Sequence, residues 1–246
     1  MSGHSKWATI KRKKGANDAK RAKVFTKIGR EISVCVKQSG SDPTTNAKLR
    51  DLIAKAKANN VPNDNIDRII KKAAGSDEKD NFEEITYEGY GPEGIAVMVE
   101  TLTDNRNRTA GDVRHYFDKF GGNLGQNGCV GYLFSKKGVL VIENDGISEE
   151  KIMEDCFDCG ADDFDYSEDA IEIYTEPASF GEVREALEEK GYSFISAEVE
   201  EVPSTYTKLT DPESIKKMEL LLENLEDHDD VQNVWHNWEN DEEDGE

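Results

Sequence analysis

The side chains best suited to chemistry in this sequence are cations gathered near its start. Residues 1–30 hold ten basic residues and one acidic residue, Asp18. Such a surface attracts the phosphate backbone of a nucleic acid, mainly because binding releases condensed counterions. Trp7 lies among these cations, where its indole could stack on a base or fix the segment in place. We therefore predict a nucleic-acid-binding surface made of Lys6, Trp7, Lys11, Arg12, Lys13, Lys14, Lys20, Arg21, Lys23, Lys27 and Arg30.

The same cations have two simpler explanations. They could form the solvated face of a helix, or they could bind the acidic remainder of the chain itself. The 246 residues carry a net charge of −21, but 18 basic and 6 acidic residues precede position 76, whereas 13 basic and 46 acidic residues follow it. Local fields decide what a surface attracts. The contrast favours a basic module that binds a polyanion, attached to an acidic body that repels one.

A second cationic segment, residues 104–109, lies between a predicted strand and a predicted helix. Backbone amides at the start of a helix can hold an anion, and the forked guanidinium groups of Arg106 and Arg108 match phosphate geometry. The alternative is an ordinary loop with Asn and Thr caps. We predict that Asn105, Arg106, Asn107 and Arg108 contact nucleic acid. Neither arginine lies on the apolar stripe of the helix, so we expect neither to be needed for folding.

Two glycine-rich segments resemble phosphate-binding loops. Residues 89–94 match the glycine spacing of a dinucleotide site, but that motif must open a helix and here the chain continues as a strand. Residues 121–128 lack the Lys-Ser/Thr of a phosphate loop. We interpret both segments as turns.

The cysteines and histidines do not form an evident metal or catalytic site. Cys156 and Cys159 have metal-like spacing but no second ligand pair, so we expect core sulfur. His228, among aspartates, could bind a cation weakly, but a solvated loop is the preferred interpretation. No side chains form a convincing acid–base or nucleophilic set. We predict no enzymatic activity, no cofactor, no metal and no small-molecule substrate.

The basic region is predicted to be helical. Apolar residues recur at spacings of three and four over residues 25–36, 49–56 and 66–73, which indicates three amphipathic helices with breaks between them. Gly75 stands where a helix commonly ends. These helices would form a small bundle over residues 1–75, preceded by an arm over roughly the first fifteen residues.

After a polar linker the pattern changes to strands and helices. Residues 137–202 follow a β-α-β-β-α-β order, which is the ferredoxin-like pattern. Their first helix, residues 148–157, should direct Ile152, Met153, Cys156 and Phe157 inward. Two capping pairs are expected, Thr109 with Asp112 and Ser179 with Glu182.

The fold class is therefore α+β and multidomain, with an N-terminal three-helix bundle and two α/β domains, one ferredoxin-like and inserted in the other. A late helix and strand, within residues 211–238, would complete the sheet that begins at residue 82. The predicted divisions are the basic helical domain at 1–75, a middle domain at 82–135 plus 204–239, the inserted domain at 136–203, and an acidic tail at 240–246.

Several short motifs are specific enough to suggest a family. They are GHSKWA at 3–8, YEGYGP at 87–92, LTDNRNRT at 102–109 and DDVQNV at 229–234. Together they resemble the YebC/PmpR family, whose mitochondrial relative is a translational activator of cytochrome c oxidase. The resemblance covers nearly the whole chain and implies three domains, the third inserted in the second. Members are described as cytoplasmic transcriptional regulators that bind DNA, and others act in translation at the ribosome.

Two main hypotheses for the function follow. The first is a non-enzymatic, DNA-binding transcriptional regulatory protein. The alternative is a ribosome-associated translation factor that binds ribosomal RNA and relieves stalling at polyproline stretches, and dispersed cations suit folded RNA. A weaker third is an adaptor that binds proteins through its acidic body. No apolar run approaches the roughly 20 residues of a membrane span, and no secretory signal is evident, so we expect a cytoplasmic protein without a membrane partner.

Overall fold

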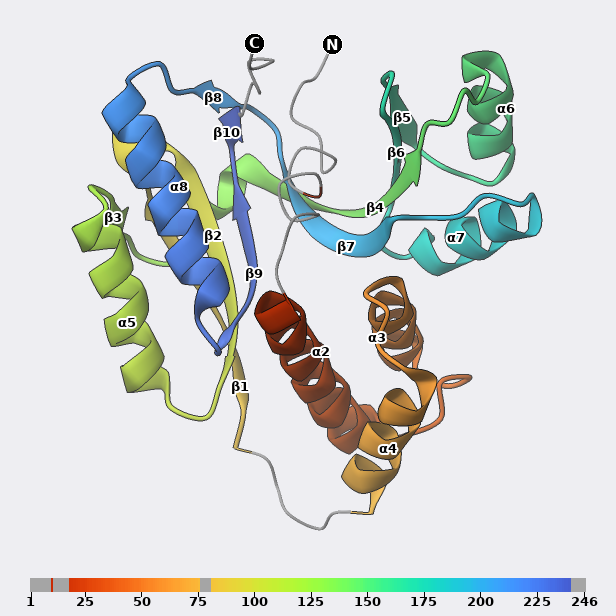
Figure 1. Ribbon diagram of the computed structural model, residues 1–246, viewed down its shortest axis with the longest axis horizontal. Coiled ribbons are helices and arrows are strands. Elements are labelled where there is room, and N and C mark those ends of the chain that lie inside the picture. Colours follow the sequence, from red (N-terminus) through yellow and green to blue (C-terminus); the bar gives the residue numbers. More distant parts are fainter. Residues whose placement is uncertain (1–9, 11–17, 76–80, 240–246) are drawn as a thin grey trace.

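The N-terminal part of the protein is a three-helix unit. The computed structural model describes residue 10 and residues 18–75 and 81–239. The helices are α2 (Asp18–Ser39), α3 (Ala47–Ala58) and α4 (Asn63–Ala74). The predicted apolar stripes meet in one core, which includes Ile28, Ile32, Val36, Leu49, Leu52, Ala56 and Ile66. In Figure 1 this unit lies below the two sheets.

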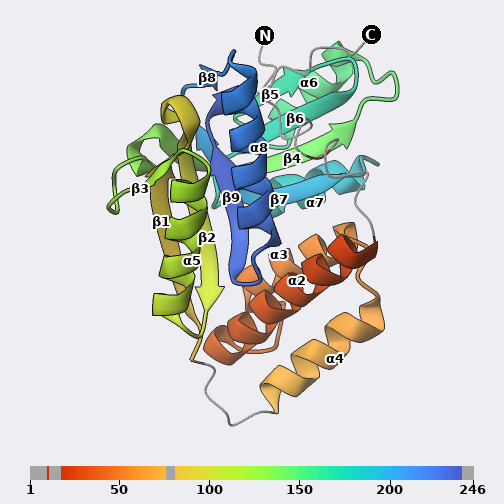
Figure 2. The same ribbon diagram turned by 60° about the vertical axis from the view of Figure 1, so that its left-hand side comes forward.

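The middle unit is a four-stranded sheet with two helices on one face. Its strands are β1 (Glu83–Tyr90), β2 (Ala96–Thr103), β3 (Asn123–Leu124) and β9 (Val231–His236), in the order β3-β1-β2-β9. The helices are α5 (Arg106–Lys119) and α8 (Pro212–Asp227). Their apolar faces bury Val113, Phe117, Met218 and Leu222 against the sheet. Because β9 pairs antiparallel with β2, the late helix and strand complete the sheet that begins near residue 82, and residues between them form a separate sheet (Figure 2).

That separate sheet has the ferredoxin-like arrangement. Its strands are β4 (Phe134–Glu143), β5 (Asp163–Tyr166), β6 (Ala170–Thr175) and β7 (Ser196–Pro203), and its helices are α6 (Glu149–Asp158) and α7 (Phe180–Glu189). The order β5-β6-β4-β7 is antiparallel throughout, and both helices pack on one face. The remaining short elements are the 3-10 turns η1 (Pro92–Gly94) and η2 (Gly131–Leu133) and the parallel pair β8 (Thr207–Lys208) and β10 (Trp238–Glu239). The predicted α+β class is confirmed, whereas the domain boundaries stay a prediction.

Three local predictions were wrong. Helix α5 begins at Arg106 rather than Thr109, because the Asn105 side chain accepts a hydrogen bond from the Arg108 amide at 3.1 Å and caps the helix earlier. Ser179 does not cap α7. Its backbone is already helical, and its hydroxyl donates to the Glu176 carbonyl instead.

The third concerns α6, where Met153 and Phe157 are 43% and 52% exposed. Only Ile152 and Cys156 of this short surface helix are buried. Burial raises the pKa of the Cys156 thiol to about 12, so it is a core sulfur as predicted. The described residues contain no group of three or more His, Cys, Asp or Glu side chains placed to hold a metal ion. They also include no helix long and apolar enough to span a bilayer.

The second glycine-rich segment is a turn that encloses an anion supplied by the protein itself. Glu88 of β1 is only 8% exposed. Its carboxylate accepts hydrogen bonds from the backbone amides of Gly128, Val130 and Gly131 at 2.7–2.9 Å. Gly128 has φ +87°, a conformation that favours glycine. The backbone amides of Gly128, Val130 and Gly131 thus surround the carboxylate on one side.

Lys55 links the three-helix unit to the ferredoxin-like sheet. Its ammonium lies 3.5 Å from Glu31 of α2 and 3.4 Å from Glu198 of β7, and all three side chains are largely buried. Burial would lower the pKa of Lys55, but Glu198 and Glu31 raise it above its ordinary value, with a smaller contribution from Glu100 of β2. Burial also raises the pKa of Glu31. One cation therefore holds together carboxylates from separate units.

Replacing Lys55 with methionine should destabilise the fold by about 3 kcal/mol near neutral pH, because it leaves buried carboxylates without their cation. The loss should shrink as the pH falls, because burial raises the pKa of Glu31 and a protonated Glu31 no longer needs a cation. Thermal or urea unfolding at neutral and at acidic pH measures this. Lys57→Met is the control, because Lys57 is exposed on the same helix; equal losses in the two variants would contradict a special role for Lys55.

Candidate nucleic-acid interface

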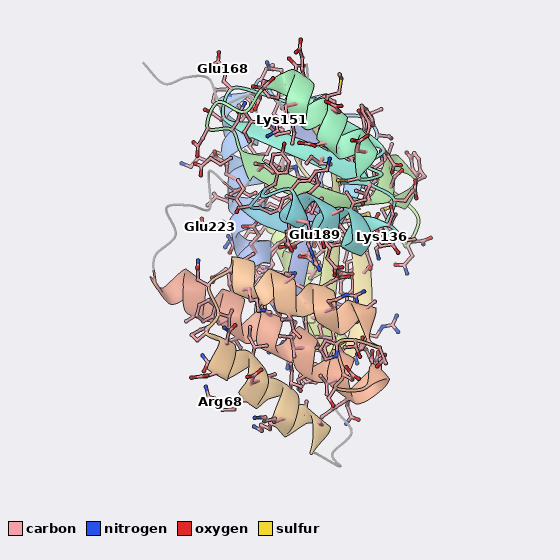
Figure 3. The ribbon with its side chains drawn as sticks, turned by 90° about the vertical axis from the view of Figure 1, so that its right-hand side faces the viewer. Arg68, Lys136, Lys151, Glu168, Glu189 and Glu223 are labelled. Carbon is pink, nitrogen blue, oxygen red and sulfur yellow. The ribbon has the colours of Figure 1, made fainter. Side chains whose placement is uncertain are left out.

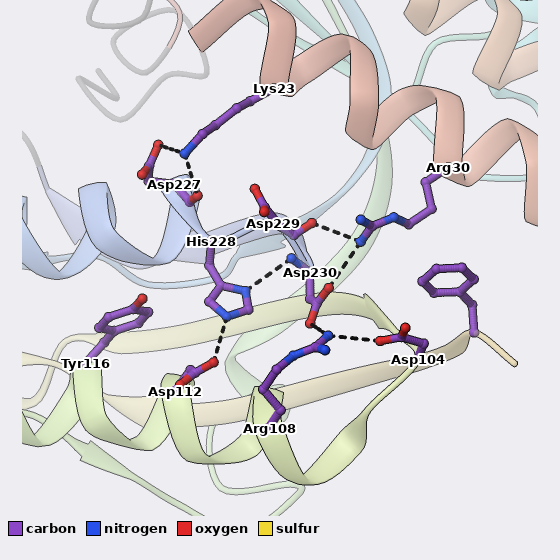
Figure 4. A pocket seen from close by; sticks show the side chains of 11 residues that line it. Lys23, Arg30, Asp104, Arg108, Asp112, Tyr116, Asp227, His228, Asp229 and Asp230 are labelled. Atoms are coloured by element: carbon purple, nitrogen blue, oxygen red, sulfur yellow. Dashed lines mark hydrogen bonds and ion pairs between the residues drawn. The ribbon is translucent and has the colours of Figure 1, made fainter. Parts of the chain in front are cut away.

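A charged cleft lies where α2 meets the middle unit. Its volume is about 510 Å³. It opens between α2, the start of α5 and the turn that follows α8 (Figure 4). The cleft is lined by Lys23, Arg30, Phe82, Asp104, Arg108, Asp112, Tyr116, Asp227, His228, Asp229 and Asp230.

Asp230 is the centre of this cleft and is 4% exposed. One carboxylate oxygen accepts from Arg108 at 2.6 Å, and the other accepts from Arg30 at 3.2 Å. The hydroxyls of Thr103 and Thr109 donate to it at 3.1 and 2.9 Å. These five residues are named the Asp230 cluster below. Thr109 therefore points inward to a carboxylate, which explains why it does not cap its helix.

The charge state of Asp230 follows from these donors. Burial alone would raise its pKa, but the hydrogen bonds from Arg108 and Thr109 hold the pKa below the usual aspartate value. The hydrogen bonds that Arg108 donates to the Asp230 and Asp104 carboxylates raise the pKa of Arg108. The cluster thus holds an ionised carboxylate between two guanidinium groups, one from α2 and one from α5.

Other cations of α2 bind the end of α8. Lys23 donates to the Asp227 carboxylate at 2.7 Å, and Lys27 donates to the Glu226 carbonyl at 2.7 Å. Arg30 also donates to the Asp229 carbonyl at 3.1 Å. Cations are favoured at the C-terminal end of a helix because its last carbonyls lack partners there. In this arrangement three of the five predicted nucleic-acid ligands in α2 bind the protein's own acidic body, which is the alternative that the sequence left open.

His228 is part of the same turn rather than a solvated loop residue. Its Nδ1 accepts from the Asp230 amide at 3.1 Å, so Nε2 carries the proton and donates to Asp112 at 3.1 Å. The ring also packs edge-on against Tyr116, with ring centroids 6.2 Å apart. These contacts fix the turn against α5.

The first turn of α5 divides the predicted loop residues into two groups. Asn105 and Arg108 have structural roles, because Asn105 caps the helix and Arg108 also donates to Asp104 at 2.9 Å. The contacts of Arg108 argue against the expectation that this residue is not needed for folding, whereas the same expectation for Arg106 stays a prediction. Arg106 and Asn107 are exposed at the helix start, where an anion could meet both side chains.

The remaining predicted ligands cannot be placed. Lys6, Trp7, Lys11, Arg12, Lys13 and Lys14 lie outside the described residues, as do the linker 76–80 and the tail 240–246. Lys20 and Arg21 belong to α2, but their side chains are outside the described part.

Three exposed cations that the sequence did not lead us to predict as ligands lie on α4. Arg68, Lys71 and Lys72 are exposed on the outer face of α4, and Figure 3 shows Arg68 on that helix. The signal was present as two adjacent lysines in the last turn of α4.

Comparisons with known proteins identify the family. The TACO1/YebC protein N-terminal domain matches residues 5–76, and the TACO1/YebC second and third domain matches residues 82–238. A probable transcriptional regulatory protein of Ruminiclostridium cellulolyticum is 65% identical over 228 residues, 92% of each chain. One of the same name from Acetivibrio thermocellus is 59% identical over 231 residues, 94% of this chain and 96% of its own.

A solved structure agrees with this assignment. The crystal structure of a conserved hypothetical protein from Aquifex aeolicus superposes with a TM-score of 0.82 at 44% identity, over 93% of this chain and 95% of that one. The resemblance predicted from the motifs is confirmed, and this chain belongs to the TACO1/YebC family.

Proposed function

We propose that this protein is a non-enzymatic, nucleic-acid-binding regulator of gene expression, and that DNA is its target. The names of the relatives support regulation of transcription. The observation that supports nucleic-acid binding is the exposed first turn of α5. Arg106 and Asn107 are exposed there, while the Asp230 cluster fixes the turn from within. A rigid helix start with a free guanidinium suits a phosphate group.

A second group of cations lies at the same end of the molecule as the start of α5, which supports this end as the surface that contacts DNA. Helix α4 ends and helix α5 begins toward the lower end in both ribbon views (Figures 1 and 2). Lys71 and Lys72 occupy the last turn of α4. Together with Arg106 and the basic arm, they would contact phosphates, which positions a protein on a duplex without reading its sequence.

The orientation of α2 bears on how DNA would be bound. Although α2 carries many cations, Lys23, Lys27 and Arg30 bind α8 and the turn after it. Their charged groups therefore already have partners within the protein. We therefore propose contact through α4, α5 and the arm, with an affinity dominated by phosphate neutralisation and hence by salt.

Arg106→Ala tests this proposal, with Arg114→Ala as the matched control, because both arginines are exposed on α5 and lie about two turns apart. Binding to a mixed-sequence DNA duplex is measured over a range of salt concentrations. Losing one phosphate contact should reduce the slope of log K against log salt by about 0.9. We expect that reduction and a several-fold weaker affinity for Arg106→Ala, and neither for Arg114→Ala.

Two results would contradict the proposal. If the two variants bind the duplex alike, the start of α5 is not the contact. If purified ribosomal subunits at matched salt bind the wild-type protein much more tightly than the duplex, DNA is the wrong target, and the ribosome-associated alternative replaces it.

A further inference from the structure

The ferredoxin-like sheet has a second face, opposite α6 and α7. Because side chains alternate along a strand, the residues that face away from the helices are known from the register. Val139, Val141 and Ala170 form the buried centre of an apolar cluster there, joined by Ile195 and Val202. This surface is named the open face below because α6 and α7 lie on the opposite face; its central side chains are nevertheless buried, and Glu198 on the same face binds Lys55 of α3.

One residue from far away in the sequence lies on this cluster. Ile10, eight residues before α2 begins, packs against the apolar residues of the open face. It is the one described residue between positions 1 and 17. This contact places Ile10 itself on the sheet.

The charges of the open face complement those of the arm. Asp165 of β5 pairs with Glu172 of β6, so both lie on this face, and Glu200 of β7 lies opposite Lys137 of β4. Glu172 and Glu200 are only 2% and 7% exposed. Among the described residues that these strands direct to this face, carboxylates thus outnumber ammonium groups. The arm places five basic residues within four positions of Ile10, which are Lys6, Lys11, Arg12, Lys13 and Lys14.

We propose that the open face is a docking site for the basic arm, residues 1–17, with Ile10 as its apolar contact and the acidic residues around it as partners for the lysines. An arm bound there is withheld from nucleic acid. A polyanion would have to compete with the face for the same cations, so the arm binds nucleic acid only after it leaves the sheet. This second part rests on the proposed function, whereas the docking itself does not.

Tryptic cleavage of the full-length protein tests docking without nucleic acid. The cut sites are Lys11 to Lys14, and mass spectrometry identifies the released arm. Ile10→Asp should be cut about tenfold faster than wild type, because a charge replaces a partly buried isoleucine that packs on an apolar cluster. Ile10→Leu keeps the apolar contact and should be cut at the wild-type rate. Equal rates for all three proteins would overturn the docking site.

Charge reversal tests the acidic part of the face. Asp165→Lys should speed release of the arm several-fold, whereas Glu189→Lys should not, because Glu189 lies on α7 on the other side of the sheet (Figure 3). The melting temperature of each variant is measured alongside. Faster cleavage without a lower melting temperature supports docking, and an unchanged rate in Asp165→Lys would overturn the role of charge.

Duplex binding tests whether docking withholds the arm. Ile10→Asp should bind DNA more tightly than Ile10→Leu, by up to about tenfold, because no docked state competes. Equal affinities would overturn withholding. If no variant binds a duplex or ribosomal subunits while Ile10→Asp is still cut faster, the proposed function fails and the docking site stands.

Discussion

Replacing Asp230 with alanine should lower the free energy of unfolding by about 3 kcal/mol, because the change removes a buried carboxylate from between two guanidinium groups. Arg30 and Arg108 lose a shared partner, and the hydroxyls of Thr103 and Thr109 lose an acceptor. Chemical denaturation at neutral pH measures the loss. Since Arg30 comes from α2, the variant should also loosen the contact between the three-helix unit and the middle unit, which hydrogen exchange along α2 would detect.

Asp104→Ala is the matched control, because Asp104 binds the same Arg108 guanidinium from an exposed position. Exposed pairs contribute little, so its loss should be below about 1 kcal/mol. Equal losses in the two variants would refute the central role of Asp230.

The pH dependence gives an independent test. The pKa of Asp230 is lower in the folded protein than its usual value. Its contribution is therefore present above about pH 4 and disappears as the pH falls through the folded-state pKa. The stability difference between wild type and Asp230→Ala should shrink under acid, and a difference that stays constant down to pH 2 would contradict this.

Glu88→Gln should destabilise the protein by about 2 kcal/mol, although the side chain keeps its shape. Three backbone amides donate to the Glu88 carboxylate. A neutral amide presents one acceptor oxygen and an NH₂ group, so at least one buried N–H loses its acceptor. The effect should be concentrated in the turn at Gly128 to Gly131, where hydrogen exchange of these amides should accelerate well before the rest of the sheet.

Glu84→Gln serves as the control for this change. It lies on the same strand, is exposed and makes a surface pair with Lys48 at 2.8 Å. Its loss of unfolding free energy should be below about 1 kcal/mol.

Burial would raise the pKa of Glu88, but the three amides hold it below the usual glutamate value. The Glu88 contribution should thus be present at neutral pH and fall away below about pH 4. If hydrogen exchange in this turn is unchanged in Glu88→Gln, the three amides find other acceptors and the prediction is wrong.

Elements with strong periodicity were predictable from the sequence. The stripes of α2, α3 and α4 become one buried core as expected, because an amphipathic helix can bury only one face. The late helix α8 begins at Pro212, where the Asp211 side chain caps it by accepting from the Ser214 amide. Local rules failed at Thr109 and Ser179, where a side chain had two possible partners and the local pattern could not choose between them.

The contacts within the candidate site could not be predicted from the sequence. The sequence itself determined that cations crowd the first part of the chain, that acidic residues dominate the rest, and that the motifs of the family are present. Only the tertiary structure decided which cations meet which carboxylates. Arg30 and Arg108 are far apart in the chain, yet both reach Asp230. Charge attraction acts through space and depends on how the units pack, so a count along the chain cannot separate a cation that binds a partner from one that binds its own fold.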